Sequence, residues 1–278
     1  MANFDSDNRH LQRSHYHIKM TYPKSEFQRF YSLILFPFLI LSVTFLCLYF
    51  VIGTTNISLS TDNLNYVLAA LVLTFTRLLI AYILALIVSV PMSLLITNNK
   101  TMEKIFLPLF DIVQSIPVLA FFPVIILIFV HSHFLNGAAI FIFFLSMVWN
   151  IIFSVVGGLH VIPNEVKEAA QIFQITGWRR LSKITIPAVV PYIITGSLLA
   201  WAQGWNIVIV AEVLHTYIYK GTSAQDLFGI GSVLVNSSAG GQHELFLLAI
   251  IAMIILIGIL NLFVWQKLLQ YSEKFKFQ

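Results

Sequence analysis

Charged residues are scarce in this chain, which has 12 acidic and 16 basic side chains among 278 residues, or 10%. Soluble globular chains carry about 25% charged residues, so an ordinary soluble domain is excluded. Hydrophobic residues reach 58%, and the mean hydropathy is +0.86. A helix needs about 20 apolar residues to cross a bilayer core of about 30 Å, so the chain has room for roughly five to seven spans.

The apolar runs do not alternate with polar residues, which favours membrane helices over a β-barrel. We therefore expect an all-α integral membrane protein. Cysteine is nearly absent, since Cys47 is the only one, and this excludes an intramolecular disulfide and a cysteine metal site.

Motifs of catalysis are also missing. The sequence contains no G-x-x-x-x-G-K-[ST] segment, so we expect no P-loop binding of ATP by this chain. The eight histidines lie in tails, loops or span ends, and none forms H-E-x-x-H. An intramembrane protease or lipid transferase needs zinc ligands or a nucleophile with a base at one depth. We expect no enzyme activity, no resident cofactor and no metal site; His10, His15 and His17 in the tail lack carboxylate or cysteine partners and form a weak candidate.

Six apolar runs are present, and each is long enough to cross a bilayer. They are approximately Leu33–Ile52, Leu64–Ile96, Phe106–Val130, Gly137–Val156, Val189–Val213 and Leu245–Trp265. The second run exceeds one perpendicular span and predicts a tilted helix. The first 32 residues are polar, unlike a cleavable signal peptide with an early apolar core, so the first span is expected to remain as an anchor.

Positive charge is distributed unevenly between the two sides of these runs. Fourteen of the sixteen Lys and Arg residues lie in residues 1–32, 98–104, 163–187 and 267–278. Positive loops stay on the cytoplasmic side, which predicts six helices with both termini cytoplasmic. The expected organisation is a cytoplasmic tail (1–32), a transmembrane domain (33–266) with an outer loop (214–244), and a cytoplasmic carboxyl-terminal tail (267–278).

The cytoplasmic insert 163–187 is polar, charged and of helical character. Asn164 can cap a helix whose first turns carry Glu165 and Glu168. Val166, Ala169, Ala170 and Phe173 share one face of it. Thr176 and Gly177 are expected to break this helix and to start a second one, which ends before Pro187.

Two interpretations of this hairpin are open. Arg179, Arg180 and Lys183 would suit an interfacial helix on lipid headgroups. Alternatively, Phe173 and Trp178 would make it a knob that docks into a soluble partner. A buried aromatic side chain covers about 150 to 250 Å² and contributes at most roughly 4 to 6 kcal/mol before ordering costs, so one such residue could dominate a joint.

The run Glu168-Ala169-Ala170, followed by Trp178, Ile184 and Pro187, resembles the EAA loop of permease subunits in binding-protein-dependent ABC importers. The nitrate, sulfonate, taurine and bicarbonate group is the most similar. Further matches are Gln114-Ser115-Ile116-Pro117, Ala120, Pro123, Gly196, Trp205, Ala211-Glu212 and Gly229-Ile230-Gly231. The family usually has glycine where this chain has Gln174, with Gly177 three residues later, which leaves open whether the turn is shifted.

The resemblance implies a type I ABC importer permease that passes a small anionic solute by alternating access in a bacterial or archaeal cell (inner) membrane. Implied partners are two ATPase subunits, which hold ATP and Mg, a second permease, identical or paralogous, and an extracytoplasmic solute-binding protein. The implied ATPase-coupling residues are Glu165, Glu168, Ala169, Ala170, Phe173, Gly177, Trp178 and Arg179. An alternative is a secondary transporter driven by an ion gradient, which would place ionisable residues at mid-membrane.

Polar residues within the spans are candidates for the translocation path or its gate. Arg77 could pair with Glu212, attract anions at the outer mouth, or extend toward the interface. Other path candidates are Gln114, Ser115, Pro117, Trp205 and Asn206, for which hydrogen bonding between helices is the alternative. Pro117 and Pro123 are expected to kink or interrupt their span. Gly229-Ile230-Gly231 is expected to form a turn in the outer loop.

Overall fold

The structure is a computed structural model that describes residues 61–131, 134–213 and 226–275. The chain divides into two compact units, residues 1–56 and 57–278, and the fold below is that of the second unit. The expected cytoplasmic tail and the expected first span, residues 1–32 and 33–52, lie outside the described residues. So do residues 214–225 of the expected outer loop.

The described residues form helices joined by short connections, with no strand among them. In chain order these are α3 (Thr61–Thr97), α4 (Lys100–Ser115), α5 (Val118–His131), α6 (Leu135–Val161), α7 (Asn164–Ile172), α8 (Gly177–Arg180), the π-turn η2 (Leu181–Thr185), α9 (Ile186–Asn206), α10 (Val208–Glu212), α11 (Ile230–Ala239), α12 (His243–Leu260), the π-turn η4 (Asn261–Trp265), α13 (Gln266–Ser272) and the 3₁₀ turn η5 (Glu273–Phe275). The expected all-α fold is confirmed for this part of the chain.

Four helices in the described residues are long and apolar enough to cross a membrane. They are Thr61–Thr97, Leu135–Val161, Gly177–Asn206 and His243–Phe275. The bent pair α4 and α5 would make a fifth span, with an angle of 82° between its two helices. The span expected at residues 106–130 is therefore broken at Pro117, whereas Pro123 lies inside α5. Because the expected first span falls outside the described residues, the count of six stays a prediction.

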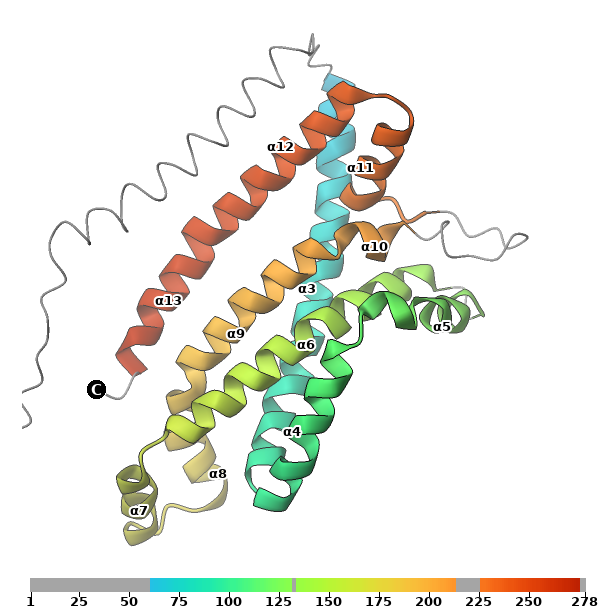
Figure 1. Cartoon of the computed structure of the whole chain (residues 1–278). Coiled ribbons are helices and arrows are strands. Elements are labelled where there is room, and N and C mark those ends of the chain that lie inside the picture. The colour runs from blue at the N-terminus through green and yellow to red at the C-terminus, as the bar shows by residue number, and fades with distance from the viewer. Residues whose placement is uncertain (1–60, 132–133, 214–225, 276–278) are drawn as a thin grey trace, which may run out of the picture. The chain divides into compact units, whose positions relative to one another are not determined.

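α3 is a single helix of 37 residues, or about 55 Å at 1.5 Å per residue. One side of it carries small residues, which lets another helix approach closely. Ser89 and Ser93 on this side donate hydrogen bonds to the backbone oxygens of Val148 and Ile152 on α6, at 3.0 and 3.3 Å. α3 therefore packs against α6, and the two helices cross in the view of Figure 1.

α6 also packs against α9, and three glycines line this contact. A Cβ atom at Gly196 would lie 2.7 Å from Cβ of Ser154 and 3.1 Å from the backbone oxygen of Asn150. A Cβ at Gly204 would collide with Cε of Met147 and one at Gly158 with the ring of Tyr192. The two helices therefore lie at a distance that side chains at these positions would not permit.

The outer loop expected at residues 214–244 contains a helix, α11, that the sequence analysis did not predict. The expected turn at Gly229-Ile230-Gly231 is wrong, because Gly229 is the extended N-cap of α11 and all three residues are buried. A turn does occur at Gly240-Gly241, where Gly241 has a φ of 67°. This turn leads directly into α12 and lets α11 pack beside it.

We predict that Gly196→Ala lowers the stability of the fold by about 1 to 3 kcal/mol, because the new methyl group overpacks the contact with α6. Gly157→Ala is the matched control, since nothing lies within 4 Å of a Cβ at that position. It should leave stability unchanged or raise it by about 0.5 to 1 kcal/mol, the helical preference of alanine over glycine. Thermal unfolding in detergent checks both, and equal melting temperatures for the two variants would contradict the proposed close contact.

Candidate functional site

The break between α4 and α5 opens a cavity of about 600 Å³. Its wall is formed by the end of α4, one side of α5, the first half of α6, and the end of α9 with α10. The wall is mainly apolar, and the polar or amphipathic side chains in it are Gln114, Ser146, Trp149, Asn150, Gln203 and Asn206. A concave, mainly apolar site with a few convergent polar groups is the usual form of a small-molecule site.

Residues that share the cavity wall come from helices that are distant in sequence. Gln114 comes from α4, whose N-cap Asn99 accepts a hydrogen bond from the backbone N–H of Thr101 at 2.9 Å. The chain leaves this helix at Ile116 in an extended conformation because a residue before proline is disfavoured in the α region. The proline at 117 therefore ends α4 and redirects the chain, so that α5 forms a second side of the cavity.

The structure separates the path candidates into two groups. Gln114 and Asn206 line the cavity. Ser115 donates a hydrogen bond to the backbone oxygen of Asp111 in its own helix, at 2.7 Å, and is not part of the wall. Trp205 is half-buried and packs against the apolar core, and Pro117 lies at the break without lining the cavity.

Four polar or amphipathic residues of the wall were missed by the sequence analysis, namely Ser146, Trp149, Asn150 and Gln203. A signal for them exists: Ser146 and Asn150 are four residues apart in an apolar helix, and Gln203 is three residues before Asn206. Positions three and four apart lie on one helix face. Two such polar faces, on α6 and α9, are brought together by the close packing of these helices.

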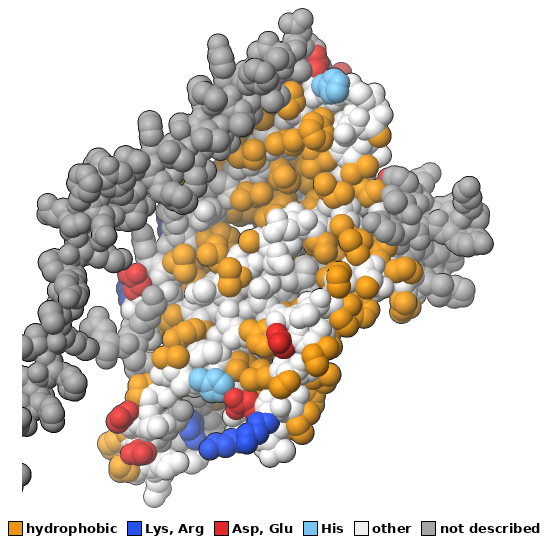
Figure 2. Space-filling model, viewed as in Figure 1, with side chains coloured by type: hydrophobic (Ala, Val, Ile, Leu, Met, Phe, Trp, Pro, Cys, Tyr) orange, Lys and Arg blue, Asp and Glu red, His pale blue; other side chains and the backbone are white. Residues whose placement is uncertain are grey.

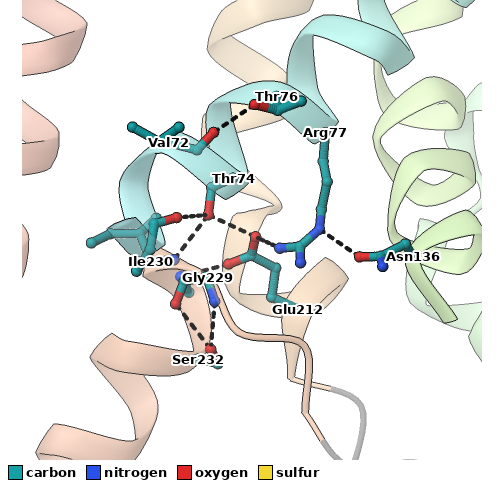
Figure 3. Close-up of polar contacts among 11 residues, drawn as sticks. Val72, Thr74, Thr76, Arg77, Asn136, Glu212, Gly229, Ile230 and Ser232 are labelled. Atoms are coloured by element: carbon teal, nitrogen blue, oxygen red, sulfur yellow. Dashed lines mark hydrogen bonds and ion pairs between the residues drawn. The ribbon is translucent and has the colours of Figure 1, made fainter. Parts of the chain in front are cut away.

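Arg77 and Glu212 form an ion pair away from the cavity wall, with 2.8 Å between Nη1 of Arg77 and Oε1 of Glu212. The same carboxylate oxygen accepts a hydrogen bond from the hydroxyl of Thr74 at 2.7 Å. The guanidinium also donates through Nε to Oδ1 of Asn136, at 3.0 Å. Figure 3 shows how this network joins residues of α3, α6, α10 and α11.

The start of α11 wraps around the carboxylate of Glu212, which is 0% exposed. The backbone N–H of Gly231 donates to Oε2 at 2.8 Å, and that of Ile230 donates to the hydroxyl of Thr74 at 2.9 Å. A Cβ atom at Gly229 would collide with both carboxylate oxygens. Burying a charge is costly unless it is paired and hydrogen-bonded, and this arrangement satisfies both oxygens. Among the three interpretations of Arg77, the structure contains the ion pair.

The insert 163–187 forms a helical hairpin at one end of the fold, made of α7 and the helix that begins at Gly177 (Figure 1). Most of the charged side chains visible in Figure 2 gather at this end, whereas the middle of the visible face is apolar. Asn164 is the first helical residue and makes no capping bond, so the expected cap is wrong. A 2.7 Å contact between Nε2 of His160 and Oε1 of Glu103 links the base of the hairpin to the start of α4.

The turn of the hairpin lies where the family usually has glycine. Gln174 has a φ of 53°, the only positive value for a non-glycine residue in the described part of the chain. Its N–H donates to the oxygen of Gln171 at 3.0 Å, and the N–H of Ile175 donates to the oxygen of Ala170 at 2.8 Å. This pair of bonds is a Schellman motif, which usually has glycine in the left-handed position. The turn at 174 is therefore retained despite the substitution.

Most of the expected coupling residues reach solvent. Phe173 is 76% exposed and Trp178 is 75% exposed, and Ile172, which the sequence analysis missed, is 78% exposed. Glu165, Glu168, Gly177 and Arg179 are exposed as well, and Ala169 is half-buried. Ala170 differs, because it is 2% exposed and packs inside the chain. It is not available for contact with a partner, and its role in the hairpin is packing beneath the turn.

The second helix of the hairpin does not end before Pro187, contrary to expectation. It runs without interruption from Gly177 to Asn206. Proline lacks an N–H, and its ring clashes with the carbonyl of the residue four positions earlier. The preceding π-turn η2, in which Ile186 donates to the oxygen of Leu181, changes the spacing of these carbonyls. The second helix of the hairpin is therefore continuous with α9, whose other end lines the cavity.

We predict that Arg77→Met destabilises the fold by about 3 to 5 kcal/mol, because it leaves the buried Glu212 charge without its cation. The double variant Arg77→Met/Glu212→Gln should recover much of this loss, because it removes the unpaired buried charge and the amide oxygen of glutamine can still accept the hydrogen bond from the N–H of Gly231. Melting temperatures in detergent compare the two. A single variant as stable as the parent chain would contradict the structural role of the pair.

Gln174→Gly should stabilise the hairpin. A left-handed conformation costs a non-glycine residue about 1 to 2 kcal/mol, and the greater entropy that glycine loses on folding offsets part of this gain. The expected net gain is up to about 1 kcal/mol. Gln171→Gly, inside α7, is the control and should destabilise by about 1 kcal/mol. Hydrogen exchange of the α7 amides measures both changes; equal protection in the two variants would contradict the assignment of the turn.

The comparisons with known proteins agree with this architecture. The family described as "Binding-protein-dependent transport system inner membrane component" matches residues 89–270. The nitrate import permease protein NrtB of Leptolyngbya laminosa is 29% identical over 156 residues, which cover 56% of this chain and 55% of that protein. The bicarbonate transport system permease protein CmpB of Synechococcus elongatus is 29% identical over 143 residues, 51% of this chain and 50% of that protein.

A further relative is the nitrate import permease protein NrtB of Synechococcus elongatus, 26% identical over 144 residues, 52% of this chain and 50% of that protein. The chain thus spans about half the length of the curated relatives it matches. The family match includes the broken pair α4 and α5, the hairpin and α9, which are the elements that form the cavity and its connection to the exposed turn. This chain belongs to the binding-protein-dependent transport system inner membrane component family and is a multi-pass membrane protein.

Proposed function

We propose that this chain is the transmembrane subunit of an ATP-driven importer and forms the path of a small solute by alternating access. The observation that carries the proposal is the continuous helix from Gly177 to Asn206. One end of it belongs to an exposed hairpin with a cluster of apolar side chains, and the other end lines a cavity of about 600 Å³. A force on the hairpin is thus transmitted to the cavity wall.

The source of that force is a separate ATPase subunit. ATP and Mg are held by this partner, and two ATPase subunits are expected, one on each of two permeases. Ile172, Phe173 and Trp178 supply the contact surface, together with the carboxylates of Glu165 and Glu168 and the guanidinium of Arg179. Gly177 and Ala169 contribute to the conformation and packing of the hairpin that carries these side chains. Burial of the two aromatic side chains in a groove of the partner provides the apolar area that an interface core needs.

The open cavity supports the participation of a second permease, identical or paralogous, which would close it. An extracytoplasmic solute-binding protein would deliver the solute, and the permease itself would carry out no covalent chemistry. The solute is proposed to be a small anion of the nitrate, sulfonate, taurine or bicarbonate type, because the relatives named above are a nitrate import permease and a bicarbonate transport permease. The complex would reside in the cell (inner) membrane of a bacterium or archaeon.

We predict that Phe173→Ala and Glu168→Lys leave the chain inserted but uncouple ATP hydrolysis from uptake. The first variant removes an exposed aromatic contact, and the second reverses a charge on α7. Leu262→Ala is the control, because Leu262 is an exposed apolar residue at 57% that lies outside the hairpin. The measurement is uptake per ATP hydrolysed in proteoliposomes, together with the amount of ATPase that co-purifies with the tagged chain in mild detergent.

Unchanged uptake in both hairpin variants would contradict the coupling role of the hairpin. A chain that purifies alone, and whose transport is indifferent to ATP, would contradict the ATP-driven importer. If the hairpin instead lay on lipid headgroups, Phe173→Ala would weaken its protection from aqueous reagents and leave the co-purifying ATPase unchanged.

A further inference from the structure

The cavity has a polar belt made of uncharged side chains. Gln114, Ser146, Asn150, Gln203 and Asn206 form it, and in the part of the chain that the structure describes no residue of the cavity wall carries a formal charge. This is unexpected for a path proposed to admit anions, since a lysine or arginine is the usual partner of a buried anion. The belt must therefore bind its solute through dipoles.

The hydrogen bonds within the belt leave N–H groups available to a solute. Asn206 donates through Nδ2 to Oε1 of Gln203 at 3.1 Å, so both N–H groups of the Gln203 amide remain. Asn150 uses one of its two N–H groups on the backbone oxygen of Ser146, at 3.3 Å. A primary amide has two N–H donors and one acceptor oxygen. The belt can thus donate several hydrogen bonds to an oxyanion and can also accept hydrogen bonds.

A negatively charged group contacts the belt. Gln114 donates through Nε2 to Oδ1 of Asp111, at 2.9 Å, which places a carboxylate immediately next to the belt. On the same helix Lys104 is ten residues before Gln114, a rise of about 15 Å, which exceeds the Debye length of about 8 Å at physiological salt. The charge of Arg77 is neutralised by Glu212 at 2.8 Å. Electrostatics around the belt therefore opposes negative charge.

This arrangement sets a limit on the charge of the solute. The energy of desolvating an ion rises with the square of its charge, whereas the stabilisation that amide dipoles provide rises only in proportion to it. A dianion would face four times the desolvation penalty of a monoanion of equal size and twice the repulsion from Asp111. We infer that the amide belt is a charge filter, which admits polar solutes carrying at most one negative charge and rejects dianions. This inference rests on the proposed function. With such a filter the permease itself would discriminate between solutes by charge, in addition to the discrimination by a binding protein.

The test uses a thiol placed in the belt. Ser146→Cys is introduced with Cys47→Ser, which removes the natural cysteine, and the chain is studied in nanodiscs with its co-purifying ATPase. The rate of modification by neutral methyl methanethiosulfonate is measured in sodium nitrate and in sodium sulfate at equal ionic strength. Nitrate should slow the reaction several-fold, and sulfate should leave it unchanged. Ser182→Cys, on the exposed turn η2 outside the cavity, should react at the same rate in both salts.

A second variant tests the origin of the filter. Gln203→Lys adds a fixed cation to the belt and should allow sulfate to protect Cys at position 146 several-fold, whereas the neutral Gln203→Met should not. Protection by sulfate equal to that by nitrate in the Ser146→Cys/Cys47→Ser chain would overturn the inference, as would protection by neither anion, or a Gln203→Lys variant that still excludes sulfate. Because the ATPase that co-purifies is measured separately, each of these results leaves the proposed importer function standing.

Discussion

The close contact between α6 and α9 is the constraint on which the other features of the structure depend. Glycine at 158, 196 and 204 removes the side chains that would separate the two helices. In a bilayer the lipid tails are as apolar as the helix surfaces, so this kind of association relies on van der Waals packing at short range. The contact places Ser146 and Asn150 of α6 beside the polar end of α9. It also holds together the two helices that flank the hairpin, because α6 precedes the hairpin and α9 follows it.

The buried carboxylate of Glu212 imposes a second constraint just after α9, at the end of α10. Its two oxygens take hydrogen bonds from a threonine hydroxyl, a guanidinium and a backbone N–H. Such a charge is tolerated only when every partner is in place, so the start of α11 must lie directly on it. This requirement, rather than a flexible turn, explains why glycine occupies positions 229 and 231. Gly229 leaves room for the carboxylate, and Gly231 leaves room for the backbone of Val208.

The sequence was sufficient for features that follow from composition and local chemistry. Apolar runs predicted the helices, Pro117 predicted the interruption of its span, and two charges in apolar surroundings suggested the pairing of Arg77 with Glu212. Features that depend on packing between distant helices were missed. Ser146 and Gln203 become neighbours of one cavity only because glycine allows α6 and α9 to touch. Pro187 was expected to end a helix. The helix instead continues through it, because a π-turn in the preceding residues changes the backbone spacing there. Gln174 adopts the left-handed conformation that the turn requires, although a non-glycine residue disfavours it.

A neutral cavity is physically suited to a path that must both admit and release its solute. A buried cation would hold an anion strongly, because charge-assisted hydrogen bonds are roughly twice as strong as neutral ones. Each additional 1.4 kcal/mol of binding reduces the rate of release about tenfold when the rate of entry is fixed. Dipoles of amides such as Asn150 and Gln203 would hold a solute less strongly, and it would leave the site more quickly. The ion pair of Arg77 with Glu212 lies away from the cavity wall and is satisfied within the protein, so the same fold uses a buried charge pair for its architecture and keeps the cavity wall neutral.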